Sequence, residues 1–228
     1  MLLVASLSQA NPDNLADYMA GADAGLLPIS QPSQGTENIQ AISGLTPAIP
    51  WGVWLKGFTQ GEIEPIVKSG CDFVVFPAVD TSLTMLQDDK VGRILEVEVS
   101  LNEGLLGAVN SLPVDAVLID SKHKEEHSLT WQHLMLFQRF ASLLAKPLLV
   151  SVPSNITANE LKALWEAGVD GVIIEVSDKN PADKLKELRR AIDKLSSTSR
   201  RKRGKTEALL PYIGGETEVV AEEAEEEE

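Results

Sequence analysis

The sequence predicts an α/β protein: a (β/α)8 barrel of eight parallel strands, followed by a charged tail. Three observations carry this prediction. One short motif occurs four times, apolar runs of a second kind alternate with it, and helical patterns fill most of the gaps between them. With 228 residues, of which 43% are hydrophobic and 24% charged, the chain is long enough to bury one sizeable core in a single domain.

The repeated motif has the pattern of a joint between a helix and a buried strand. Its four copies are AGADAGLLPI at 20–29, SGCDFVVFPA at 69–78, LPVDAVLID at 112–120 and AGVDGVIIEV at 167–176. Each copy has an aspartate two residues after a glycine or proline, and an apolar run of strand length follows. These aspartates are Asp23, Asp72, Asp115 and Asp170. A helix that ends at a glycine, a tight turn and a strand buried on both faces would give this pattern.

Four further apolar runs are predicted as the alternating strands: LLVAS at 2–6, WGVWLK at 51–56, RILEVEVS at 93–100 and PLLVSV at 147–152. Helices are expected over 13–20, 62–69, 102–112, 131–144, 157–167 and 181–195. A capping box of Thr157 with Glu160, and Pro181 at a first helical position, mark two helix starts.

The order of these elements favours a closed barrel over an open doubly wound sheet, which is the alternative fold. Short strands in a long, uninterrupted βα succession are typical of the barrel. The alternation of two strand types indicates that the basic repeat is βαβα, present four times. A closed barrel requires the first strand to pair with the last, Leu3 to Ser6 against Val172 to Val176.

The joints, notably EAGVDGVIIEV, resemble those of the phosphate-binding (β/α)8 barrels, the group that contains phosphoribosylanthranilate isomerase, the tryptophan synthase alpha subunit and inosine monophosphate dehydrogenase. The resemblance covers residues 1–195 at the level of architecture and matches no specific family. In that group, glycine-rich loops after strands seven and eight hold a phosphate. The corresponding stretches here, VPSNITANE and EVSDKNPADK, contain no glycine. Ser154 and Asn155 could still donate hydrogen bonds to a ligand, or they could simply cap a helix.

Strand parity predicts which side chains point into the barrel, because alternate residues face the helices and the apolar set takes that face. In RILEVEVS this rule sends Glu96 and Glu98 inward, and in WGVWLK it sends Trp54 and Lys56 inward. Further inward side chains near the carboxyl ends of strands are Ser6, Asp120, Ser151 and Glu175. Barrels of this fold carry their chemistry at that end.

This cluster predicts a lyase or isomerase that acts on a small carbonyl or carboxylate metabolite by acid/base chemistry. The expected catalytic residues are Lys56, Glu98, Asp120 and Glu175, and the expected ligand-binding residues are Ser6, Trp54, Glu96, Ser151, Ser154 and Asn155. A protonated Lys56 would stabilise a developing oxyanion or enolate, with Glu98 or Glu175 as the base. A Schiff base on Lys56 is less favoured, because neighbouring carboxylates keep the amine protonated.

Two other interpretations of the same cluster stay open. Paired charges inside a barrel can form a purely structural ion network. The carboxylates Glu96, Glu98, Asp120 and Glu175 could instead hold one Mg²⁺ or Mn²⁺ ion. Since Lys56 already supplies a cation, we expect neither a metal nor another cofactor.

Composition argues against several classes of function. A formal net charge of −14 opposes binding to nucleic acid and to anionic membranes. The sequence contains no run of eighteen apolar residues that could span a membrane, and residues 1–7 lack the basic region of a signal peptide. A cytoplasmic protein is therefore expected. One cysteine, Cys71, and three histidines make a Cys/His zinc site a poor explanation.

Residues 196–228 are predicted to form a flexible charged tail after the barrel domain of residues 1–195. Five basic residues lie within 200–205, and the chain ends in glutamates. The flanks 196–206 and 221–228 are expected to be disordered, because they cannot bury enough apolar surface to offset the entropy of ordering. The apolar segment 207–215 between them is a candidate docking peptide. The alternative function is therefore a noncatalytic barrel that binds a protein partner through this segment.

The expected helix over 131–144 carries an apolar stripe of Trp131, Leu134, Met135 and Gln138. We interpret this stripe as the face that packs on the barrel. His123 and His127 fall in a polar stretch and are expected to be solvated loop residues.

Overall fold

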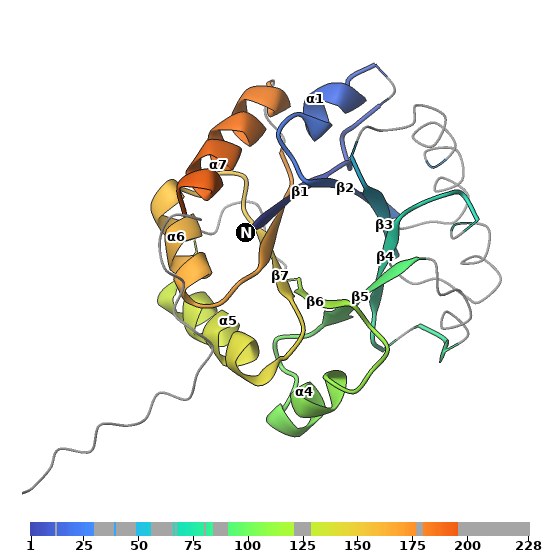
Figure 1. The fold of residues 1–228 in the computed structure, drawn as a ribbon, viewed down its shortest axis with the longest axis vertical. Helices are drawn as coiled ribbons and strands as arrows, with labels where there is room; N and C mark the ends of the chain where they lie inside the picture. Colours follow the sequence, from blue (N-terminus) through green and yellow to red (C-terminus); the bar gives the residue numbers. More distant parts are fainter. Residues whose placement is uncertain are drawn as a thin grey trace, which may run out of the picture.

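The structure is a computed structural model, and it describes residues 1–11, 13–29, 39, 49–55, 66, 68–79, 81–83, 91–120, 129–176 and 180–195. Eight parallel strands form a closed barrel in chain order (Figure 1). They are β1 (Leu2–Ser6), β2 (Ala24–Ile29), β3 (Trp51–Leu55), β4 (Phe73–Pro77), β5 (Gly92–Val97), β6 (Ala116–Ile119), β7 (Leu148–Val152) and β8 (Gly171–Ile174). The predicted pairing of the first and last strands is confirmed, with Leu3 opposite Val172 and Val4 opposite Ile173.

The described helices lie outside the barrel along part of its circumference, from α1 past α7, α6 and α5 to α4, as Figure 1 shows. They are α1 (Leu15–Met19), α4 (Glu103–Val109), α5 (Trp131–Leu143), α6 (Ala158–Glu166) and α7 (Pro181–Leu195). The capping box of Thr157 and Glu160 and the helix start at Pro181 are confirmed. Within the described part of the chain, no helix has the length and hydropathy that crossing a bilayer requires.

The four aspartates of the repeated motif all make the same pair of hydrogen bonds. In each copy the aspartate donates its backbone N–H to the carbonyl of one residue at the start of the preceding strand, at 2.8 to 2.9 Å. Its carboxylate Oδ2 accepts the backbone N–H of that same residue, at 2.7 to 2.9 Å. The pairs are Asp23 with Leu3, Asp72 with Trp51, Asp115 with Arg93, and Asp170 with Leu148. The motif therefore recurs because it fastens each even-numbered strand to the strand before it.

Three copies of the motif turn from helix to strand through a glycine with positive φ: Gly21 at +88°, Gly70 at +86° and Gly168 at +100°. An L side chain is strained in this conformation, which explains the glycine at the predicted helix ends. The remaining copy has Pro113 at the equivalent place. There the carbonyl of Pro113 accepts a hydrogen bond from Arg93 Nη1 at 3.1 Å.

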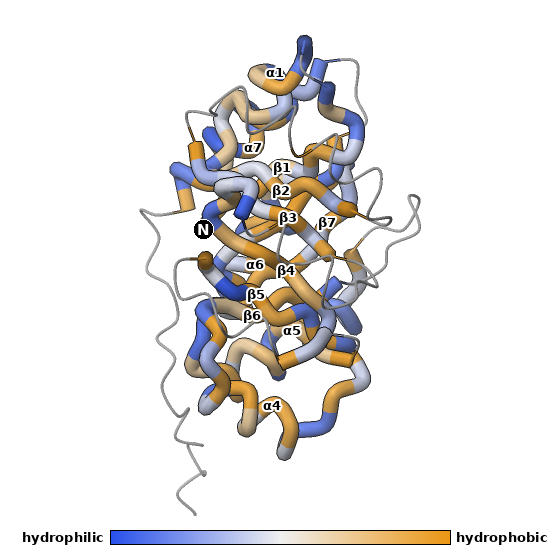
Figure 2. Tube along the Cα trace, turned by 90° about the vertical axis from the view of Figure 1, so that its right-hand side faces the viewer, coloured by the Kyte–Doolittle hydropathy of each residue, from blue (hydrophilic) through white to orange (hydrophobic). Residues whose placement is uncertain are grey.

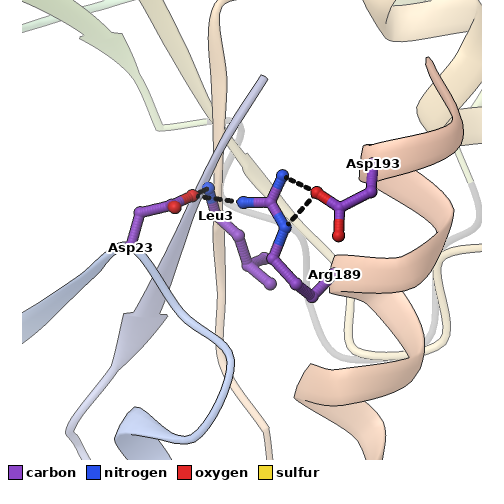
Figure 3. A network of polar contacts seen from close by, with 4 residues as sticks. All are labelled: Leu3, Asp23, Arg189 and Asp193. Atoms are coloured by element: carbon purple, nitrogen blue, oxygen red, sulfur yellow. Dashed lines mark hydrogen bonds and ion pairs between the residues drawn. The ribbon is translucent and has the colours of Figure 1, made fainter. Parts of the chain in front are cut away.

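The last helix is tied to the first joint by an ion pair (Figure 3). Arg189 of α7 places Nη1 2.7 Å from Asp23 Oδ2, the oxygen that also accepts the N–H of Leu3. The same guanidinium donates from Nε to Asp193 at 2.9 Å. The ion pair thus links the last helix of the chain, α7, to the joint that precedes β2.

Two apolar cores hold the barrel together, and Figure 2 shows hydrophobic residues along its strands. The outer core lies between the strands and the helices and includes Phe137 and Phe140 of α5. The inner core fills the barrel with inward side chains: Val4, Leu26, Trp54, Val75, Leu118, Leu149 and Ile173. The predicted parity of the strands agrees with this division, since Leu95 and Val97 belong to the outer core.

One interpretation of the sequence is wrong. Trp131 and Met135 of α5 are 82% and 70% exposed, and Gln138 is exposed too, so this stripe does not pack on the barrel. The buried face of α5 is formed by Phe137, Phe140 and Ala141, while Leu134 is only partly buried against the outer core. Both faces of this helix carry large apolar residues, so the helical period could not tell which one faces the strands.

Several predicted features lie outside the described residues. They are Lys56, the loop that contains His123 and His127, and residues 196–228 with the apolar segment 207–215. The boundary of the barrel domain at residue 195 coincides with the end of α7 at Leu195. The domain division itself stays a prediction.

Candidate functional site

The strand register brings four of the predicted site residues to one level of the barrel. In barrels of this kind the strands tilt by about 36° and side chains of alternate strands share a level, four at a time. To find the residue at the same height two strands further on, we follow the two paired residues across the strands and then move two residues toward the carboxyl end. Ser6 pairs with Leu26, and Leu26 pairs with Gly52, so Trp54 lies level with Ser6.

The same counting closes around the barrel. Trp54 leads through Val75 and Ile94 to Glu96. Glu96 leads through Leu118 and Leu149 to Ser151, which leads through Ile173 and Val4 back to Ser6. We call this set the polar level; its members are Ser6, Trp54, Glu96 and Ser151. The level below it consists of apolar side chains only: Leu26, Val75, Leu118 and Ile173.

The polar level contains one carboxylate, and an indole orients it. Trp54 donates its Nε1–H to Glu96 Oε2 at 2.6 Å, across two strands and in a part-buried setting. Trp54 is only 8% exposed, so its ring is held by the barrel wall rather than by solvent. A short hydrogen bond to an ionised acceptor is of the stronger kind, and it fixes the plane of the carboxylate. Glu96 is thus presented in a defined orientation above an apolar floor.

Ser6 and Ser151 place hydroxyl groups at the same level. Ser6 is 8% exposed and is one of the buried polar residues of the described chain, while Ser151 is half-buried. A hydroxyl can both donate and accept, so each can turn to suit a bound group.

The next level toward the carboxyl ends combines two prolines and two carboxylates. Pro28 and Pro77 belong to it within β2 and β4, and Asp120 and Glu175 come directly after β6 and β8. Asp120 is half-buried, and its inward direction stays a prediction. Glu175 follows β8, is exposed, and accepts a hydrogen bond from Ser8 Oγ at 2.5 Å. Ser8 was not among the predicted site residues, although it lies two positions after Ser6 in the sequence.

Two predicted inward residues are exposed instead. β5 ends at Val97, and Glu98 is turned into the following bend, where it accepts a hydrogen bond from Ser100 Oγ at 2.9 Å. Glu98 and Glu175 are both exposed, so they belong to the rim and not to the interior. The parity rule holds only while the chain is a strand, and both residues come after the last strand position.

Ser154 and Asn155 lie in the turn between β7 and α6. The helix cap itself is Thr157, whose hydroxyl accepts from the backbone of Glu160, so the capping interpretation of Ser154 and Asn155 is wrong. Ser154 is half-buried and Asn155 is exposed. Their roles as ligand-binding residues stay predictions.

The described residues at the carboxyl ends of the strands are acidic or uncharged. The carboxylates are Glu96, Glu98, Asp120 and Glu175, and no Lys, Arg or His stands among the described residues that directly follow a strand. In the part of the chain that the structure describes, no three His, Cys, Asp or Glu side chains come together in a way that could hold a metal ion.

Solved structures with the same fold are numerous. Thiamine phosphate pyrophosphorylase from Pyrococcus furiosus aligns over 85% of this chain and 96% of its own, with a TM-score of 0.66 and 13% identity. 3-Hexulose-6-phosphate synthase from Salmonella typhimurium aligns over 86% of this chain and 100% of its own, with a TM-score of 0.66 and 14% identity. Phosphoribosyl anthranilate isomerase from Thermotoga maritima covers 85% of this chain and 100% of its own, with a TM-score of 0.64 and 16% identity.

At such identities the likeness shows the fold alone. It confirms the resemblance of this chain to the phosphate-binding (β/α)8 barrels at the level of architecture. No protein-family model matches the chain, and no curated protein sequence matches it.

Proposed function

We propose that this barrel is a proton-transfer enzyme of the lyase or isomerase type, acting on a small carbonyl compound that carries no phosphate. The observation that carries the proposal is the Glu96 carboxylate, held by the Trp54 indole at 2.6 Å in the polar level. A positioned carboxylate above an apolar floor is what abstraction of a proton next to a carbonyl group needs. The location at the carboxyl ends of the strands is where this fold carries chemistry.

In the proposed reaction Glu96 takes a proton from the carbon next to the carbonyl group. The electrons of that C–H bond form a carbon–carbon double bond, and the π electrons of the carbonyl group move to its oxygen, which gives an enolate. The hydroxyls of Ser6 and Ser151 are suited to donate hydrogen bonds to this oxygen, and Lys56, two residues after Trp54, is the predicted cation that offsets its charge. If the substrate is an α-hydroxy carbonyl compound, its hydroxyl proton moves to the former carbonyl oxygen and the abstracted proton returns to the former carbonyl carbon, which gives an isomer. If a leaving group stands on the carbon β to the carbonyl group, its departure with the electron pair of its bond gives a lyase product. Asp120, Glu98 and Glu175 are the further groups predicted to exchange protons with the substrate.

The absence of phosphate from the substrate distinguishes this proposal from the activities named for the similar structures. The loops after β7 and β8 contain no glycine whose backbone could wrap a phosphate. The carboxylates at the strand ends would repel a dianion, and only Lys56 is predicted to attract one. A neutral carbonyl compound, or one with a single carboxylate paired to Lys56, is compatible with this arrangement.

Hydrogen exchange in D₂O tests the proposal without knowledge of the natural substrate. The probes are dihydroxyacetone, pyruvate and dihydroxyacetone phosphate, and proton NMR measures the loss of the C–H signal next to the carbonyl group. We expect the protein to accelerate exchange of an unphosphorylated probe and not of the phosphorylated one. Glu96→Gln should slow the accelerated exchange by at least about 100-fold, the usual contribution of a general base.

The matched control is Glu187→Gln, which removes a carboxylate that is 73% exposed on α7, away from the strand ends. It should exchange at the wild-type rate. The proposal is wrong if Glu96→Gln exchanges as fast as this control, or if only the phosphorylated probe is processed.

A second candidate is a noncatalytic barrel that binds a protein partner through residues 207–215. The exposure of Glu98 and Glu175 favours it, since two predicted catalytic carboxylates lie at the rim instead of inside the barrel. Deleting residues 204–228 should leave the melting temperature nearly unchanged if the segment serves a partner. A large loss of stability would show instead that the segment belongs to the core of the barrel.

A further inference from the structure

The outward surface of α4 and α5 carries almost no charge. The exposed residues of α5 are Trp131, Gln132, Met135, Gln138 and Ser142, and those of α4 are Glu103, Gly104, Leu105, Gly107 and Ala108. Glu103 is the single charge among them, and Arg139 of α5 approaches it with Nε at 3.5 Å. Figure 1 shows α4 and α5 as neighbours on the outside of the barrel, and we call their exposed residues together the α4–α5 face.

This lack of charge is specific to the α4–α5 face. On α7 every exposed residue is charged: Asp183, Lys186, Glu187, Arg190, Asp193 and Lys194. The protein as a whole has a net charge of −14, so an uncharged surface of two helices is not a consequence of composition. Depletion of charged residues distinguishes the centre of protein interfaces from the rest of a protein surface.

The apolar side chains of this face are large. Trp131 is 82% exposed, which is about 200 Å² of a ring system of this size. Met135 at 70% and Leu105 at 53% are the other large apolar side chains exposed on these two helices.

Among the described residues, no close contact explains the two glycines of α4. A Cβ atom built on Gly107 would meet nothing within 4 Å, and one on Gly104 would meet only the Asn102 side chain at 3.4 Å. Neither glycine has a positive φ. Each costs about 0.5 to 1 kcal/mol of helix stability relative to alanine. Their presence is explained if a bulky group of another molecule packs closely against α4.

We propose that the α4–α5 face is the contact surface between two copies of this chain. The face holds both halves of a complementary pair: the protruding Trp131 and Met135 on α5, and the flat surface of Gly104, Gly107 and Ala108 on α4. A twofold axis between the helices brings α5 of each copy onto α4 of the other, as an isologous dimer requires.

The chemistry of the face also selects a second copy over a different protein. Two copies of a chain with a net charge of −14 repel each other, and a surface that adds almost no charge near the twofold axis keeps this repulsion small. Gln132 and Gln138 satisfy this condition, because an amide both donates and accepts and can pair with its own equivalent. Recognition of a different partner would draw on charge complementarity, which this face does not offer.

Sedimentation velocity on the full chain between about 1 and 100 µM tests the proposal. We expect a species of twice the 24.7 kDa chain mass at the upper concentrations. Trp131→Glu should weaken dimerisation at least tenfold, as expected for a central aromatic anchor. Gly107→Gln should weaken it to a similar degree from the opposite side of the contact. Both positions are exposed, so circular dichroism and the melting temperature of the monomer should be unaffected or slightly improved.

The control is Lys186→Glu on the charged surface of α7, which should dimerise within twofold of the wild type. A wild type that is monomeric at 100 µM overturns the proposal, and so does a dimer that both Trp131→Glu and Gly107→Gln leave intact. A chain that dimerises only after deletion of residues 204–228 also overturns it, because the face would then be covered by the apolar segment 207–215 of its own chain.

Discussion

The two ends of the barrel are built on different principles. At the amino ends of the strands, four aspartates make the same two hydrogen bonds to the strand before them, with distances that differ by no more than 0.2 Å. Among the described residues at the carboxyl ends no such repetition exists, since the polar level combines two serines, a tryptophan and a glutamate. The aspartate contact is repeated because the same joining of two neighbouring strands is needed four times around the barrel. Variety is what a site for one asymmetric ligand requires, and this fold separates stability from chemistry in this way.

The interior shows the same change from one end to the other. Toward the amino ends, small residues stand against large ones: Gly52 lies against Phe73, and Gly171 against Leu149. Such packing leaves no room for a ligand. Toward the carboxyl ends, the Trp54 ring packs in the inner apolar core, and its Nε1–H donates a hydrogen bond to Glu96. If this comparison is sound, substitutions should cost the most stability at the amino ends and the least at the polar level.

The largest expected effect is that of Gly52→Ala. The added Cβ would lie 2.4 Å from Phe73 Cδ2 and 2.5 Å from the Phe73 carbonyl oxygen, so backbone as well as side chain must move. Overpacking of this kind costs about 3 kcal/mol. For a chain of this size the melting temperature should fall by about 6 to 12 °C. Gly92→Ala is the graded control, because its Cβ meets Phe73 Cβ at 3.2 Å and a small adjustment suffices. Equal melting temperatures for the two variants would contradict the packing argument.

A smaller loss is expected for Asp23→Ala. The carboxylate of Asp23 accepts the N–H of Leu3 and the guanidinium of Arg189, whereas that of Asp72 accepts the N–H of Trp51. Losing the acceptor of a part-buried N–H costs about 1 to 2 kcal/mol. The half-exposed ion pair adds at most about 1 kcal/mol, because solvent screens it. Urea unfolding should therefore rank Asp23→Ala below Asp72→Ala in stability.

Arg189→Met isolates the ion pair in a double-mutant cycle with Asp23→Ala. The coupling free energy between the two substitutions should be about 0.5 to 1 kcal/mol. Additive losses would mean that Arg189 contributes through packing of its side-chain carbons and not through the charge of Asp23.

The repeated joints were predictable because their signal is local and occurs several times. Gly168 and Asp170 stand two residues apart, and the same spacing at Gly21 and Gly70 supports the interpretation. The sequence therefore predicted the barrel, its strand order and the pairing of β1 with β8. It did not reveal that each aspartate binds the start of the preceding strand, because that contact joins residues 20 to 22 positions apart.

The directions of side chains were predicted well where the chain is a strand and poorly beyond it. Trp54 and Glu96 lie inside β3 and β5, and parity placed both correctly in the interior. Glu98 and Glu175 come after the last strand residue, where the backbone turns and the alternation no longer applies. The exposed stripe of α5 was misassigned for a related reason: a helical period shows which residues share a face, and only packing decides what that face meets.

The smallest change in stability is expected for Glu96→Gln. The amide oxygen of the new side chain can still accept the Trp54 N–H, so the hydrogen bond at the polar level survives in weaker form. The free energy of unfolding should therefore stay within about 0.5 kcal/mol of the wild type or rise by up to about 1 kcal/mol, as is common when a functional group is neutralised. Urea unfolding near pH 7 measures it, with Trp54→Phe as the companion variant that removes the indole donor and leaves the carboxylate. A loss above about 2 kcal/mol for Glu96→Gln would show that the carboxylate holds the barrel together, and the contrast between a structural end and a functional end would then fail at its central residue.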